Sequence, residues 1–364
     1  MSTEPPSARE AHGDAARQLL AAARERFAVA SVDLLLPDQA RLTEWQRITA
    51  AALLAQLVQT IESALRAKLA AAFPGHEAFR AALGSAHVPI VLPILERANI
   101  LRDIDLGTVL VRRVEEHRFH REQQGAADAL LLELIGDDDA TVAAAAMALL
   151  IARSRRFDRF NEPLMDETEL AAELQHKLVW IVAAALRQYA VRHHHVSPAE
   201  LDSVLAAAAT AQIGAHDEGE SLEARASRLA AALDAAERLD DALVLRVIAE
   251  GDLPLFVAAL GRRAGLAFEA AWEVLSDPRG KGPPLLLRAS DVTREAAAAI
   301  LLSLNTRSRL FSGREGDAAV AQLDSYDALD VGAARATLRL WQADPGYRSA
   351  IARLSTRVRS AEAA

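Results

Sequence analysis

Apolar residues along this chain recur at spacings of three and four, and alternation with a period of two is hard to find. Residues three and four apart share one face of a helix, whereas alternate residues share one face of a strand. The clearest apolar stripe runs over residues 54–69, after a capping-box sequence at Thr43-Glu-Trp-Gln46 and before a stop at Pro74-Gly75. The pattern predicts an all-α protein.

Start and stop signals divide the rest of the chain into further helices. Asp105 is the predicted N-cap of a helix over 106–119, and Ser197-Pro-Ala-Glu200 is a strong start signal. Residues 214–220 and 277–284 are predicted loops, and the weakly periodic stretch 153–166 is a candidate hinge. The other predicted helices cover residues 8–30, 126–135, 141–154, 169–194, 222–237, 242–249, 253–263, 268–276, 294–304, 331–342 and 347–360.

One helix junction recurs along the chain. An apolar residue precedes each helix start, a Val/Ile-Leu pair follows eight and nine residues later, and an arginine lies four residues earlier. We therefore predict an irregular superhelical stack of helix pairs, a HEAT-like α-solenoid, although the 26-residue offset between two junctions is shorter than usual helical repeats. The apolar residues are Val196, Leu266 and Val292, and the arginines are Arg192, Arg262 and Arg288.

Four segments are predicted along the chain. Residues 1–40 form a flexible N-terminus with a first amphipathic helix, and residues 41–160 form an N-terminal helical part. Residues 161–305 hold the helix-pair repeats, and residues 306–364 form a C-terminal helical appendix or cap.

Composition narrows the function classes. The net charge is −9, which argues against nucleic acid as the primary partner. The chain contains no cysteine, so disulfides, thiolate nucleophiles and cysteine-ligated zinc are excluded. The start does not resemble a signal peptide, and the longest apolar runs, 142–152 and 178–186, are shorter than the ~20 residues of a membrane span. We therefore predict a cytoplasmic protein without a membrane span.

Three stretches of sequence resemble a known family. They are Arg41-Leu-Thr-Glu-Trp-Gln-Arg47 with the stripe behind it, Val88-Pro-Ile-Val-Leu-Pro-Ile-Leu95-Glu96 with the following 101–106, and Leu260-Gly-Arg-Arg-Ala-Gly-Leu266. Together they are similar to DUF2336, an uncharacterised bacterial family common in alphaproteobacteria, over residues 42–304. The resemblance implies HEAT-like helix pairs in a bacterial cytoplasm and carries over no catalytic residue.

The segment 153–160 is the first candidate site. If it is helical, residues three apart share a face, and their guanidinium groups could hold a phosphate, a nucleotide or an acidic peptide. Alternatively it is a helix end stabilised by cations, with Phe157 and Phe160 in the core and with Asp158, Glu162 and Asp166 neutralising the charge. The arginines of this segment are Arg153, Arg155, Arg156 and Arg159.

The junction arginines Arg192, Arg262 and Arg288 are the second candidate site. Each falls near a helix end, so stacked repeats could align them in a row that recruits an acidic peptide or nucleotide. In the alternative, each arginine satisfies carbonyl groups at the end of its own helix.

Histidines supply the third candidate. His117 and His120 are three residues apart beside Glu116, a spacing that can place two imidazoles on one face for a metal ion. The adjacent His193-His-His195 cannot share one helix face, so a three-histidine site there would require the helix to unwind.

No nucleophile elbow or phosphate-binding glycine loop is present in the sequence, and acidic pairs such as Asp137-Asp-Asp139 and Asp240-Asp241 are predicted to be helix caps. We therefore expect a non-catalytic, regulatory scaffold or adaptor that binds a protein partner and uses no cofactor. The alternative is a sensor of a small anionic ligand at Arg153–Arg159, and the third possibility is a His-ligated metallohydrolase.

Overall fold

The computed structural model describes residues 41–85, 89–122, 128–160, 162–165, 167–311, 318–344, 346–348, 350–351 and 354. The predicted helix at 8–30, and most of the one at 347–360, lie outside these residues. The chain divides into two compact units, residues 1–43 and 44–364, and the helices below belong to the second.

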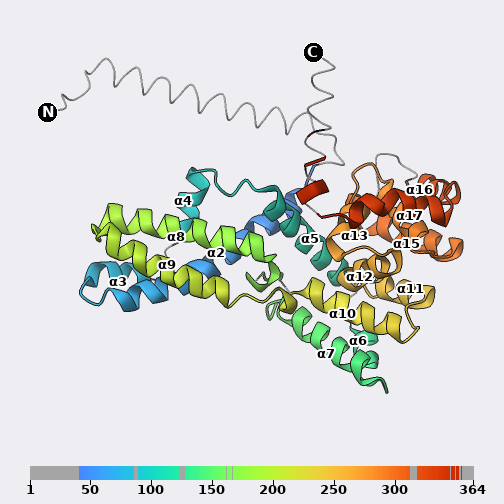
Figure 1. The fold of residues 1–364 in the computed structure, drawn as a ribbon, viewed down its shortest axis with the longest axis horizontal. Helices are drawn as coiled ribbons and strands as arrows, with labels where there is room; N and C mark the ends of the chain where they lie inside the picture. The colour runs from blue at the N-terminus through green and yellow to red at the C-terminus, as the bar shows by residue number, and fades with distance from the viewer. Residues whose placement is uncertain are drawn as a thin grey trace, which may run out of the picture. The chain divides into compact units, whose positions relative to one another are not determined.

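The described residues of this unit are mostly helical and contain no strand, so the predicted all-α class is confirmed. Short 3-10 turns occur at η2 (Glu167–Glu169), η3 (Glu218–Glu220), η4 (Arg309–Phe311) and η5 (Arg339–Gln342). In chain order the α-helices in Figure 1 are α2 (Glu44–Ala72), α3 (Glu77–Gly84), α4 (Val91–Arg97), α5 (Ile104–Arg121), α6 (Ala129–Ile135), α7 (Ala140–Ser154), α8 (Ala172–His194), α9 (Pro198–Gly214), α10 (Leu222–Ala235), α11 (Asp241–Ala249), α12 (Leu253–Ala264), α13 (Phe268–Leu275), α14 (Gly282–Ala289), α15 (Arg294–Arg307), α16 (Ala318–Asp327) and α17 (Val331–Leu338).

The helices pack into two apolar cores that do not follow chain order. One core joins α2, α3, α4, α8, α9 and the first half of α5, and the other joins α6, α7 and α10 to α17. Residues 41–160 and residues 161–305 therefore each contribute helices to both cores. Within 306–364, Tyr326 and Leu338 are buried in the second core, so α16 and α17 pack on the helices before them.

The long helix α2 forms the axis of the first core (Figure 1). By length and composition alone it could cross a membrane. Leu57, Ile61 and Leu65 on its apolar stripe are buried against α5, α8 and α9. A buried core helix passes the same test, so this feature is weak evidence for a span.

The recurring junction is a real structural unit. Helices α9, α13 and α15 begin two residues after Val196, Leu266 and Val292, as predicted. These three apolar side chains are buried. Each of them anchors the turn between two helices in the core.

The residue before each anchor adopts the left-handed conformation, with φ of 51° at His195, 71° at Gly265 and 54° at Asp291. At two of the junctions the anchor's backbone N–H then closes the preceding helix: Leu266 donates to the Gly261 carbonyl at 2.8 Å, and Val292 donates to the Leu287 carbonyl at 3.2 Å. This is the helix-ending motif in which a left-handed residue is followed by a buried apolar residue.

Two local predictions were wrong. Residues 277–284 are not a loop throughout, because α14 begins at Gly282 and carries Pro283 and Pro284 in its first turn. Proline is well suited to that turn, where its missing N–H leaves no helical bond unmade. The N-cap of α5 is Asp103 rather than Asp105, since its carboxylate accepts the backbone N–H groups of Asp105 and Leu106. The caps predicted at Asp139 and Asp240 are confirmed.

Two glycine substitutions test the start of α14. A methyl group on Gly282 would lie 1.7 Å from the Val274 carbonyl oxygen, whereas one on Gly107 in α5 meets no described atom within 4 Å. We expect Gly282→Ala to lower the free energy of unfolding by about 3 kcal/mol and Gly107→Ala to raise it by up to about 1 kcal/mol. Urea denaturation at neutral pH measures both, and equal effects would contradict the close α13–α14 contact.

Candidate functional site

Helix α5 places charged residues where an apolar stripe is expected. Leu106 and Leu110 begin its buried face, and farther along the helix every residue of the sequence Arg112-Arg-Val-Glu-Glu-His117 is buried, so α5 is covered on all sides there. All five charged or polar side chains of this sequence are at most 6 % exposed, and Glu115 is fully buried. A helix packs charges inside only when each of them finds partners.

Six of the buried side chains form what we call the α5 ion cluster. They come from α5, from the segment after α7, from η2 and from the start of α10, and their three positive and three negative charges balance. The contacts include Arg112 Nη2 to Glu223 Oε1 at 2.8 Å, Arg113 Nη2 to Glu169 Oε2 at 2.8 Å, and Arg156 Nη1 to Glu116 Oε2 at 3.3 Å. The members are Arg112, Arg113, Glu116, Arg156, Glu169 and Glu223.

The two central carboxylates of the ion cluster differ. Burial raises the pKa of Glu116 above its ordinary value, because the attraction of Arg113 only partly compensates. Burial also opposes the charge on Glu223, but Arg112 and Arg113 outweigh it and hold the pKa of that carboxyl below its usual range. Glu223 is therefore the firmer anchor for the arginines.

Arg153 belongs to a separate group of three charged side chains. Its guanidinium contacts the carboxylates of Asp128 and Asp252. Asp252 also caps α12 by accepting the backbone N–H of Leu255 at 3.1 Å. Burial lowers the pKa of Arg153 despite these partners. This arginine, proposed from the sequence as an anion ligand, already has acidic partners.

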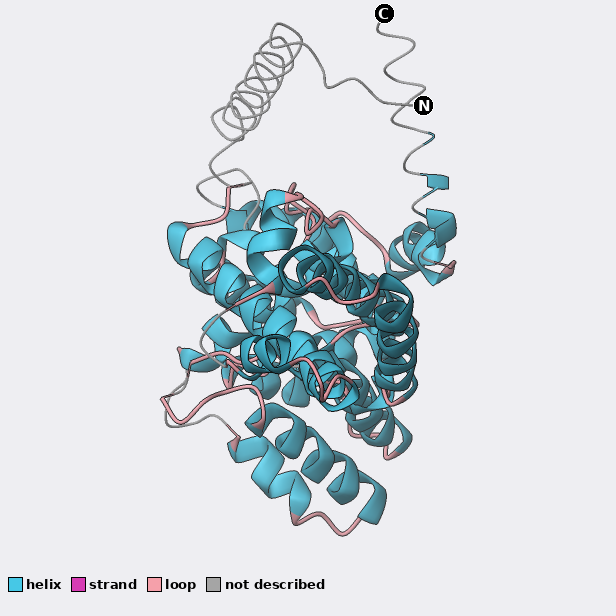
Figure 2. Cartoon of the chain, turned by 90° about the vertical axis from the view of Figure 1, so that its left-hand side faces the viewer, coloured by secondary structure: helices cyan, strands magenta, loops and turns pink. Residues whose placement is uncertain are grey.

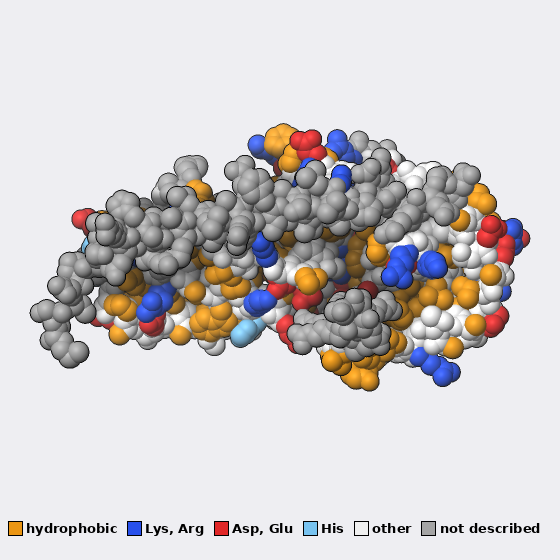
Figure 3. All heavy atoms as spheres, turned by 90° about the horizontal axis from the view of Figure 1, so that it is seen from above, with side chains coloured by type: hydrophobic (Ala, Val, Ile, Leu, Met, Phe, Trp, Pro, Cys, Tyr) orange, Lys and Arg blue, Asp and Glu red, His pale blue; other side chains and the backbone are white. Residues whose placement is uncertain are grey.

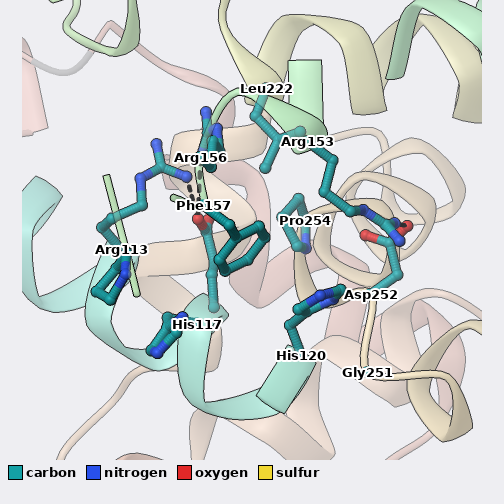
Figure 4. Close-up of a pocket in the computed structure, with 12 residues that line it drawn as sticks. Arg113, His117, His120, Arg153, Arg156, Phe157, Leu222, Gly251, Asp252 and Pro254 are labelled. Carbon is teal, nitrogen blue, oxygen red and sulfur yellow. Dashed lines mark hydrogen bonds and ion pairs between the residues drawn. The ribbon is translucent and has the colours of Figure 1, made fainter. Parts of the chain in front are cut away.

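A small cavity of about 30 Å³ lies between the ion cluster and Arg153 (Figure 4). Phe157 projects toward its middle, with the two α5 histidines on one side. About two water molecules fit in such a volume. The lining includes His117, His120, Arg153, Arg156, Phe157 and Pro254.

The rings beside this cavity form a continuous stack. His117 lies 6.2 Å from Trp45 and 5.5 Å from Phe157, and His120 lies 4.5 Å from Phe157, between ring centroids. Neither ring nitrogen of His117 makes a hydrogen bond to a described residue. Burial, with the positive charges of Arg121 and His120, lowers the pKa of His117 to about 4. His117 is therefore neutral at physiological pH.

The geometry does not support the hypothesis of a metal site at His117 and His120. Phe157 packs against both His117 and His120. Among the described residues, no three His, Cys, Asp or Glu side chains are grouped to hold a metal ion. In the other histidine run, His194 contacts the Tyr189 hydroxyl at 3.3 Å and His193 stacks near the same ring.

The arginines of 153–160 do not share a face, because α7 ends at Ser154. Arg153 and Arg156 are buried, whereas Arg155 and Arg159 are exposed. The expected core position of Phe160 is wrong, since its side chain is 69 % exposed.

The predicted local neutralisation of these arginines is also wrong. The carboxylates that pair with Arg153 and Arg156 lie on distant segments, whereas Asp158 accepts the backbone N–H groups of Phe160 and Glu162. Asp166 lies outside the described residues.

The three junction arginines have three different environments. Arg262 Nε donates to Asp234 at 2.7 Å, and both side chains are about half exposed. Arg288 donates to the Leu329 carbonyl at 2.7 Å and lies over the Tyr326 ring. Arg192 is exposed in the last turn of α8. The structure gives them no common partner among the described residues.

These observations define an all-α protein whose central helix is held by a buried, charge-balanced ion cluster. Residues 90–339 match the family described as "Uncharacterised protein conserved in bacteria (DUF2336)". The chain belongs to this family, as its sequence predicted. The matched range contains the whole ion cluster but not α2, where one of the resembling stretches lies. No curated protein and no solved structure matches the chain.

Sequence reasoning missed the ion cluster apart from Arg156. One signal was present: the stripe that starts at Leu106 and Leu110 reaches Arg113 and His117 at the next helical spacings. Charged residues at core positions indicate buried partners. Their partners Glu169 and Glu223 lie in unrelated segments, and nothing local singles them out.

Substitutions of two neighbouring arginines test whether the buried ion cluster stabilises the fold. Arg156→Ala removes one of the three positive charges that face Glu116, Glu169 and Glu223, which leaves an uncompensated buried negative charge, and should lower the free energy of unfolding by about 3 to 5 kcal/mol. Arg155→Ala removes an exposed side chain and should change it by less than about 0.5 kcal/mol. Guanidinium denaturation compares the two, and similar losses would argue against the cluster.

His117 should make the fold acid-sensitive. A histidine in the unfolded chain has a pKa of about 6.5, whereas the pKa of His117 in the folded chain is about 4. Between these two pH values the imidazole binds a proton in the unfolded chain but not in the folded chain. The stabilisation is complete above pH ~6.5 and is lost as the pH falls toward ~4.

The free energy of unfolding of the natural chain should therefore fall between about pH 7.5 and about pH 4.5. In the His117→Phe variant that fall should be about 2 kcal/mol smaller, as measured by urea denaturation at both pH values. The exposed His76→Gln is the control and should follow the natural chain. Identical pH profiles for all three proteins would contradict the buried neutral imidazole.

Proposed function

We propose that this protein is a non-catalytic, regulatory adaptor of the bacterial cytoplasm that binds a protein partner. The binding surface is the Phe160 loop, which we define as residues 157–160 with 162 and 163. The observation that carries the proposal is the 69 % exposed ring of Phe160, over which the Arg159 guanidinium lies at 4.7 Å.

The Phe160 loop is held in one shape by its own backbone. Phe157 and Pro163 form an antiparallel bridge, and Leu164 N–H donates to the Arg156 carbonyl at 2.7 Å. The Asp158 carboxylate accepts the N–H of Phe160 at 2.7 Å and that of Glu162 at 2.9 Å. A preorganised loop loses little conformational entropy on binding.

The chemistry of the loop indicates the partner. Aromatic and arginine side chains are enriched at the centre of protein interfaces, where a ring fills a pocket and a guanidinium meets an acceptor. Phe160 and Arg159 together fit an apolar pocket with a carboxylate at its rim. Because the base of the loop packs on His117 through Phe157, the ring is presented from a fixed support.

The surface chemistry fits this partner better than a nucleic acid. On the face shown in Figure 3, acidic and basic side chains are interspersed with apolar ones, and the coloured atoms form no continuous basic surface. Together with the net charge of −9, this favours a protein partner.

The alternative, a sensor of a small anion, has less support. Arg153 and Arg156 are already paired with carboxylates, and their cavity of about 30 Å³ is far below the ~300 Å³ at which ligand pockets begin. Only the exposed Arg155 and Arg159 remain for a ligand on this segment.

Affinity capture with variants of the Phe160 loop tests the proposal. Tagged protein and its Phe160→Ala and Arg159→Glu variants are used to capture proteins from a lysate of the encoding organism. Phe160→Ala should recover at least ~10-fold less of a specific partner, since an interface anchor is worth about 2 kcal/mol or more. Arg159→Glu should also reduce recovery, because the new carboxylate would face the carboxylate at the rim of the partner's pocket.

Leu302→Ala is the matched control, because Leu302 is 58 % exposed on α15, away from the loop in the chain. It should capture like the natural protein. Thermal unfolding checks that every variant is folded. A partner retained equally by Phe160→Ala and Leu302→Ala would overturn the loop as its site.

A further inference from the structure

Helix α7 is apolar on every side. Its inner stripe of Val142, Ala146 and Leu149 is buried against α6 and α10. Its outer stripe is equally apolar but exposed, with Met147 at 43 % and Ile151 at 45 %. A helix that is apolar all round is normally covered on all sides.

The outer stripe lies at the edge of the second core. The strongest packing of α7 is with α10 and with α6, its neighbour in a helical hairpin. This hairpin is the lowest element in both Figure 1 and Figure 2, with no described segment beyond it. The outer stripe is therefore free to meet another molecule.

Opposite charges stand at the two ends of the stripe. Asp138 and Asp139 precede the first turn, and Arg155 follows the last. The stripe continues to Arg155 at helical spacing through Ala144, Met147, Ala148 and Ile151. Asp138 and Arg155 are both exposed, and within the described residues neither forms an ion pair.

We propose that two copies of this chain associate by packing α7 against α7 in antiparallel orientation, about a twofold axis at Met147. Met147 is the middle residue of α7, seven positions from Ala140 and seven from Ser154. An antiparallel pair centred there brings Arg155 of each copy to Asp138 and Asp139 of the other.

The charge pattern favours a second copy of this chain as the partner of the stripe, and it favours the antiparallel orientation of the two helices. A surface with an acidic end, an apolar middle and a basic end is complementary to its own inverted copy, which is the condition for a twofold interface. A parallel pair would place Arg155 beside Arg155. Ala144 and Ala148 let the two helix backbones approach closely.

The small size of the contact limits its strength. A helix of 15 residues is about 22 Å long, so one helix pair buries less than the ~1,200 Å² of a standard interface. The dimer is therefore weak and depends on concentration. The Phe160 loop does not take part, so dimerisation is independent of the proposed adaptor function.

Sedimentation velocity of the full chain tests the dimer. From about 5 µM to about 500 µM, the average mass should rise from 39.1 kDa toward twice that value. Met147→Glu places two carboxylates at the twofold axis and should remain a monomer throughout. Leu302→Glu and Phe160→Ala should dimerise like the natural chain. A natural chain that stays monomeric, or a Leu302→Glu variant that fails to dimerise, overturns the proposal.

A charge exchange tests the antiparallel register. Arg155→Asp faces acidic residues and should weaken association by at least about 10-fold. Combining it with Asp138→Arg should recover most of that loss. Both residues are exposed, so unchanged thermal unfolding confirms that the variants are folded. Weakening by Arg155→Asp without recovery in the double variant overturns the antiparallel arrangement.

Discussion

The balance of charge around α5 is the constraint on which the packing of this protein depends. Three arginines and three glutamates are removed from water together, and removing any one leaves a buried charge in the cluster uncompensated. The members come from four separate segments of the chain. The ion cluster can therefore form only when those segments pack in one arrangement relative to each other. Helix α5 also contributes Leu110 to the first core and Phe119 to the second, so the ion cluster lies where the two cores share a helix.

This arrangement divides the arginines at the end of α7 and in the segment after it into two groups. Arg153 and Arg156 turn inward and are occupied by carboxylates, whereas Arg155 and Arg159 remain at the surface. The inward pair fixes the end of α7 and the base of the Phe160 loop. We propose two binding surfaces, the Phe160 loop and the outer stripe of α7. Both adjoin the segment that the inward arginines hold in place, so their exposed side chains have a rigid support.

Local signals predicted much of the fold. Helix existence followed from apolar periodicity, and the junctions at Val196, Leu266 and Val292 were recognisable because a helix-ending turn is encoded within about six residues. Failures were local too: Gly282-Pro-Pro was interpreted as a loop although proline also starts helices, and Asp103 competed with Asp105 for the same cap. The candidate site was predicted only in part, because Arg153 and Arg156 were placed with the exposed arginines.

The sequence by itself determined the all-α class, the family, most helix positions and the recurring junction, since these depend on residues within one or two turns of each other. Only the tertiary structure decided which charges are buried, which helices share a core and which apolar faces stay exposed. Arg112 and Glu223 are 111 residues apart and meet at 2.8 Å. The packing of whole helices brings such a pair together, and no local sequence pattern predicts it.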